Sequence, residues 1–157
     1  MKATASALLV VLLLCSASAQ EKPDFSGLYL LDTAKPGKHQ KAQPLIYLRV
    51  TQSERVLEAT LINPAGQRFT SKYFLDGSPS QNLEVGEFPS KDSARFRGKA
   101  LLIESVVQVH GTALHQKQKW QLSRKSETLT IHLRSGGSSG GKPSEGSRWN
   151  QVYTRQP

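Results

Sequence analysis

The chain has 157 residues and a formal net charge of +9, with 21 Lys and Arg against 12 Asp and Glu. It contains a single cysteine, Cys15, which excludes an intramolecular disulfide. The positive balance favours anionic partners. A chain of this size can bury about two-thirds of its unfolded surface, enough for one core without a metal or a cross-link.

The first residues have the pattern of a secretory leader. Lys2 precedes an apolar stretch over 7–14 and small residues at 17–19, which predicts a signal peptide over 1–19 that is removed. A retained membrane helix is disfavoured because spanning needs about 20 apolar residues. Lipid attachment at Cys15 is disfavoured because Leu14 stands where such a signal needs a small residue.

Cleavage would leave 157 minus 19, or 138 residues, with a net charge of +8 once Lys2 is lost. Without Cys15 the mature chain has no thiolate chemistry and no thiol redox function. The leader predicts an exported protein, in the periplasm or outside the cell, that does not span a membrane.

Alternating apolar and polar residues predict a series of antiparallel strands. A first strand spans 25–33 and a second spans 45–52. A turn at 54–55 sets Val50 opposite Ala59, which keeps the apolar side chains of both strands on one face.

Turn signals at 63–66 and 76–77 bound the next strands. Two prolines make 78–93 irregular, so only a short or edge strand is expected there. Regular alternation resumes at Ala94.

Three successive strands in the second half are predicted to share one inward face. Folding about a turn at 110–111 places Ser105 opposite Gln116, and the next hairpin places Trp120 opposite Ile131. Chance alternation would seldom give such agreement between neighbouring hairpins.

The Gly- and Ser-rich segment 135–147 lacks side chains that could anchor it in a core, which predicts a flexible loop. A closing strand follows at 149–154. No stretch after the leader keeps apolar residues at helical spacing. The expected fold is all-β: one domain over 20–157 that forms an antiparallel up-and-down β-barrel of about eight to ten strands.

A set of short β-rich motifs lies along most of the chain, at 24–32, 50–53, 96–98, 101–105, 120–123, 129–131 and 152–153. This set resembles small bacterial secreted proteins with a lipocalin-like, calycin-type β-barrel. Gly27-Leu28-Tyr29 looks like the Gly-x-Trp opening of lipocalins, with Tyr in place of Trp. The resemblance implies a structural closure of one barrel end by Gly27, Tyr29 and Arg155, with the guanidinium lying across the ring.

Polar side chains on an apolar inward face point to a ligand site. Ser105, Gln116 and Gln118 share their predicted face with Leu, Ile, Val and Trp residues, and buried polar groups need hydrogen-bond partners. A ligand head group or trapped water would supply them. The alternative is that they pair with one another or lie at the wet mouth of the barrel. With Trp120 they form the candidate ligand-binding set.

The opposite, outward face carries Lys117, Lys119, His132 and Arg134, with Lys119 expected opposite His132 and Lys117 opposite Arg134. This is a candidate anion-binding patch. An ordinary solvated strand face is the alternative, because Glu104 is expected opposite Lys117 and can neutralise it. No exposed aromatics are interleaved with these cations, so no specific nucleic-acid partner is expected.

No catalytic constellation stands out. The four histidines lack metal-ligand spacing and no serine lies in a Gly-x-Ser-x-Gly elbow, so neither an enzyme, a metal nor a cofactor is predicted. The favoured function is binding of a small apolar or amphipathic ligand inside the barrel. The alternative is a non-catalytic structural or interaction module of the cell envelope that acts through its basic outer surface.

Overall fold

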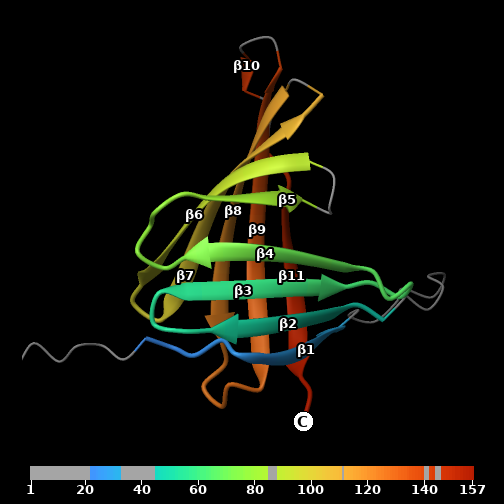
Figure 1. Ribbon diagram of the computed structural model, residues 1–157, viewed down its shortest axis with the longest axis vertical. Coiled ribbons are helices and arrows are strands. Elements are labelled where there is room, and N and C mark those ends of the chain that lie inside the picture. The colour runs from blue at the N-terminus through green and yellow to red at the C-terminus, as the bar shows by residue number, and fades with distance from the viewer. Residues whose placement is uncertain (1–21, 33–44, 85–87, 111, 140–141, 144–145) are drawn as a thin grey trace, which may run out of the picture.

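A computed structural model describes residues 22–32, 45–84, 88–110, 112–139, 142–143 and 146–157 (Figure 1). The predicted leader, with Cys15, lies outside the described residues. Every regular element in the described part of the chain is a β-strand, and none of it is a helix long and apolar enough to cross a membrane.

The strands form one antiparallel sheet in the order β4-β3-β2-β1-β11-β9-β8-β7-β6-β5, and the two-residue β10 pairs only with β9. Each strand after β1, except β5 and β11, therefore pairs with its predecessor along the chain, and β11 inserts between β1 and β9. The all-β antiparallel barrel predicted from alternation is confirmed. The strands are β1 (Gly27–Asp32), β2 (Tyr47–Gln52), β3 (Val56–Ile62), β4 (Arg68–Phe74), β5 (Ser80–Glu84), β6 (Phe88–Arg97), β7 (Ala100–Val109), β8 (Thr112–Leu122), β9 (Thr128–Ser139), β10 (Lys142–Pro143) and β11 (Arg148–Arg155).

The predicted strand registers are confirmed. Val50 pairs with Ala59 and Trp120 with Ile131, and all four of these side chains are buried. Because side chains alternate across a strand, correct pairing at one position places every second residue of both strands in the core. Figure 1 shows β2, β3 and β4 crossing β9 and β11 steeply, so the sheet folds into two facing walls.

Two predicted boundaries differ from the structure. The segment 78–93 holds the short edge strand that was expected, β5, and also the first six residues of the ten-residue β6. Two parts of the segment predicted as a loop, 135–147, are strand. β9 continues to Ser139 and pairs with β8 as far as Leu114 with Gly137, and β10 pairs with the end of β9. Backbone pairing needs no apolar side chain, so a Gly- and Ser-rich strand can extend here.

Side chains and one isolated backbone bridge, between Asp76 and Arg95, join the two ends of the sheet. No strand pairing links β4 to β5 among the described residues. Instead, Asn82 on β5 accepts a hydrogen bond from the Lys72 backbone N–H (2.8 Å) and donates to the Lys72 carbonyl (3.0 Å). Asn82 also donates to Asp92 Oδ2 (2.6 Å), which Ser90 Oγ contacts at 2.9 Å. We call this set, Asn82, Lys72, Asp92 and Ser90, the seam.

The opposite part of the barrel is closed by a cluster around Tyr29. Its hydroxyl donates to the Phe25 carbonyl (2.9 Å) and accepts from Arg155 Nη2 (2.7 Å), which also donates to the Ser26 carbonyl (2.8 Å). The guanidinium carbon lies 5.3 Å from the Tyr29 ring centroid, within the range of a cation–π contact. Gly27 has φ +154°, and a Cβ there would lie 3.1 Å from Arg155 Nε, so a bare backbone suits this close approach.

Candidate functional site

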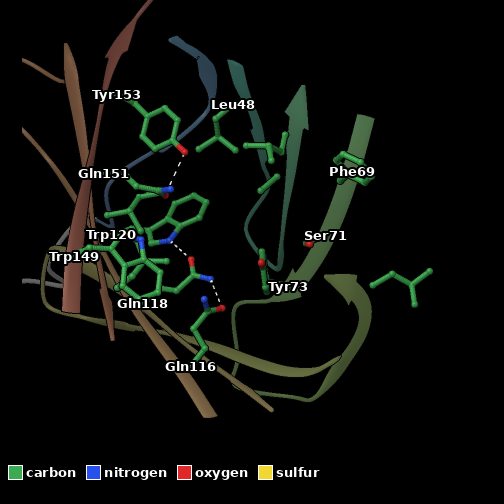
Figure 2. Close-up of a pocket in the computed structure, with 15 residues that line it drawn as sticks. Leu48, Phe69, Ser71, Tyr73, Gln116, Gln118, Trp120, Trp149, Gln151 and Tyr153 are labelled. Atoms are coloured by element: carbon green, nitrogen blue, oxygen red, sulfur yellow. Dashed lines mark hydrogen bonds between the residues drawn. The ribbon is translucent and has the colours of Figure 1, made fainter. Parts of the chain in front are cut away.

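A cavity of about 260 Å³ lies between the two walls of the barrel. The wall formed by β2, β3 and β4 is mainly apolar and contributes Leu48, Ala59, Leu61, Phe69, Ser71 and Tyr73. Figure 2 shows the facing wall, where β8 and β11 contribute three glutamines and three aromatic side chains. The lining residues from β9, Ile131 and Leu133, are apolar. A cavity lined in this way excludes water from its apolar side and offers directional groups on the other.

The predicted ligand-binding residues lie partly at this cavity. Gln116, Gln118 and Trp120 line it, but Ser105 does not. The three lining residues form a hydrogen-bond chain, in which Trp120 Nε1 donates to Gln118 Oε1 (2.9 Å) and Gln118 Nε2 donates to Gln116 Oε1 (3.3 Å) (Figure 2). Gln116 and Gln118 are therefore paired with each other, which was the alternative to a ligand contact. The Gln116 amide nitrogen remains at the cavity.

Ser105 lies within a polar row that crosses five strands and reaches the cavity at Gln116. The backbone register aligns Ser80, Asp92, Ser105, Gln116 and Ser135 as successive partners. Ser105 is 2% exposed and its Oγ has no hydrogen-bond partner among the described residues; the same holds for Asp92 Oδ1. A buried polar atom without a hydrogen-bond partner lowers the stability of the fold. This row is therefore the polar edge of a core that is otherwise apolar.

Sequence reasoning missed a second polar pair, on β11. Gln151 and Tyr153 line the cavity, and the Tyr153 hydroxyl donates to Gln151 Oε1 (3.3 Å). Burial raises the pKa of Tyr153 to about 12, so the phenol stays protonated at neutral pH and remains a donor. Trp149, Gln151 and Tyr153 are spaced by two residues, so their side chains lie on the same face of β11. The same spacing identified the inward residues of β8.

The cavity reaches the surface at two apolar side chains. Leu83 on β5 and Trp149 on β11 both line it and remain 52% and 40% exposed.

The predicted basic patch lies on the outward face as expected from the register. Lys117 pairs with Arg134 and Lys119 with His132. Lys117 Nζ lies 3.0 Å from Glu104 Oε1, and this ion pair lowers the pKa of Glu104. His132 Nδ1 contacts Asn150 Oδ1 at 2.9 Å. A shallow hollow of about 370 Å³ lies over these strands. In the described ranges, no three His, Cys, Asp or Glu side chains group as metal ligands do.

Comparison with models of protein families finds no match, and comparison with curated proteins finds none. Solved structures do match. A chain described as "REP1-NXSQ fatty acid transporter" is 7% identical with a TM-score of 0.60, over 85% of this chain and 96% of that one. Zebrafish ileal bile acid-binding protein, crystallised with cholic acid, is 14% identical with a TM-score of 0.56, over 84% and 98%. The fluorescent protein UnaG is 12% identical with a TM-score of 0.55, over 84% and 97%.

These similarities extend over most of each chain, but the sequence identity is very low, so they show a shared fold and no more. The calycin-like barrel that the sequence predicted is the architecture that this chain shares with them. Shared architecture does not transfer a ligand, because one barrel serves many functions.

Proposed function

We propose that this protein is a non-enzymatic binding protein that takes a small apolar or amphipathic molecule into the barrel cavity. The observation that carries the proposal is the 260 Å³ cavity between an apolar wall and a wall with a few polar groups. Engineered apolar cavities of about 150 Å³ already bind benzene, so this one has room for a larger molecule. The similar structures described as a fatty acid transporter and a bile acid-binding protein support the same use of the interior.

Filling the cavity tests the proposal. Ala59 lines the apolar wall and is 6% exposed, so Ala59→Leu would occupy ligand space without removing a hydrogen bond. Ala113 on β8 has the opposite alternation to Gln116 and Gln118, and Ala113→Leu is the matched control on the outward face.

The measurement is titration with Nile red, a neutral dye whose emission increases in apolar surroundings. We expect saturable binding to the wild type and to Ala113→Leu, and at least about tenfold weaker binding to Ala59→Leu, the equivalent of about 1.4 kcal/mol. Equal affinity of the two variants, or no saturable binding to the wild type, would contradict an interior site.

We also propose that the protein is exported with residues 1–19 removed, on the strength of the leader pattern alone. Sequencing of the amino terminus of the natural protein would give Gln20 if this is correct and Met1 if it is not.

The basic outer surface is the second candidate. Arg148 pairs with Arg134 and so adds a cation to the row that contains Lys117, which favours an anionic partner. Binding to anionic lipid vesicles should then weaken as salt is added, because exposed charges are screened. Binding that does not respond to salt would exclude this surface as the contact.

A further inference from the structure

The hydrogen-bond chain on β8 has a fixed direction. An indole Nε1 can only donate, so the contact of Trp120 with Gln118 requires the Gln118 oxygen at that end of the amide. The Gln118 nitrogen then donates to the Gln116 oxygen. The consequence is that the free end of the chain, at the cavity, is the Gln116 NH₂ group, which is a donor (Figure 2).

The pair on β11 ends in the same way. Tyr153 donates to the Gln151 oxygen, which leaves the Gln151 NH₂ group. Neither of these two amide nitrogens takes part in a hydrogen bond within the described part of the chain. Two unengaged donors at a mainly apolar cavity are complementary to an acceptor on the ligand, such as a carbonyl oxygen.

Charge restricts the acceptor further. Among the described residues that line the cavity there is no Lys, Arg or His. The buried acid nearest in register is Asp92, two strands from Gln116 in the same row and 1% exposed. An anionic group in the cavity would have no counter-ion and would lie on the same side of the barrel as this carboxylate, and an unpaired buried charge is strongly unfavourable.

We propose that the cavity selects uncharged ligands that combine an apolar body with a carbonyl-type acceptor, and that it discriminates against carboxylates of the same shape. Gln151 is in register with Trp120 through Ile131, and Gln116 lies four residues further along β8. The two amide nitrogens are therefore separate donors, and the acceptor takes its hydrogen bond from one of them. This assignment rests on the proposed binding function and specifies the ligand's chemistry.

A matched series of compact probes tests it: naphthalene, 2-acetylnaphthalene and 2-naphthoate, measured by equilibrium dialysis at neutral pH. They share a ring system and differ in the acceptor and the charge. We expect 2-acetylnaphthalene to bind at least about tenfold more tightly than 2-naphthoate. At least one of Gln116→Leu and Gln151→Leu, the one that removes the donor to the acceptor, should reduce the preference for 2-acetylnaphthalene over naphthalene several-fold. Gln108→Leu, at an exposed position of β7, should leave it unchanged.

The outcomes separate the two proposals. If 2-naphthoate binds as tightly as 2-acetylnaphthalene, or if both glutamine variants keep the wild-type preference, the ligand class assigned here is wrong, although the cavity still binds. If none of the three probes binds to the wild-type chain, the proposed binding function fails and this assignment fails with it.

Discussion

The Asn82 side chain joins the two end strands of the sheet, β4 and β5. Asn82→Ala removes two hydrogen bonds to the Lys72 backbone, one to Asp92 and a longer one to Ser80 Oγ (3.4 Å). A neutral hydrogen bond contributes about 0.5 to 1.5 kcal/mol and one to a charged group about 1.5 to 3 kcal/mol. Water can replace part of these contacts at a half-buried seam, so we expect the free energy of unfolding to fall by about 2 to 4 kcal/mol.

The assay is urea denaturation of Asn82→Ala beside Gln81→Ala, which changes the exposed neighbouring residue on the same strand. Hydrogen exchange adds a local measurement, because the Lys72 amide donates to Asn82 and should exchange faster in the variant. If Asn82→Ala is no less stable than Gln81→Ala and the Lys72 amide keeps its protection, the seam does not close the barrel as described.

Three further predictions concern the closed end and the β11 phenol. Gly27→Ala should lower the free energy of unfolding by about 1 to 3 kcal/mol through overpacking, because its Cβ would lie 3.1 Å from Arg155 Nε at φ +154°; chemical denaturation with an unchanged midpoint would refute this. Tyr29→Phe removes the hydroxyl that joins Phe25 to Arg155, and calorimetry should show a loss of about 1.5 to 3 kcal/mol rather than wild-type stability. Burial raises the pKa of Tyr153 from 10.0 to about 12. The contribution of the protonated phenol to the free energy of unfolding is therefore complete below about pH 10. It is lost as the pH rises toward 12, by up to about 3 kcal/mol. Denaturation across this pH range should show that decline in the wild type and a smaller one in Tyr153→Phe.

The alternation of side chains was sufficient to predict most of the fold. The pairs of Ser105 with Gln116 and Trp120 with Ile131 follow from hairpins, where a short turn fixes the register. The start of β6 was missed because Pro89 is a poor strand residue. It lies one position before β6 begins to pair with β7 at Ser90, so its missing N–H interrupts no bond with that neighbour.

The candidate site was predictable only in part, for a related reason. Gln116, Gln118 and Trp120 lie on one hairpin face, and periodicity places them at the interior. The contact of Asn82 with Lys72 joins two consecutive strands that do not pair with each other, so no strand register specifies it. The direction of the glutamine amides likewise depends on contacts between side chains and not on spacing.

Native mass spectrometry of the natural protein, before and after denaturing extraction, tests the central claim most directly. We expect a complex heavier than the bare polypeptide, with an extractable uncharged molecule that accounts for the difference in mass. If the natural protein has the bare polypeptide mass, and no fatty acid, isoprenoid or aromatic probe changes that mass or the melting temperature, the claim that the barrel carries a ligand is contradicted.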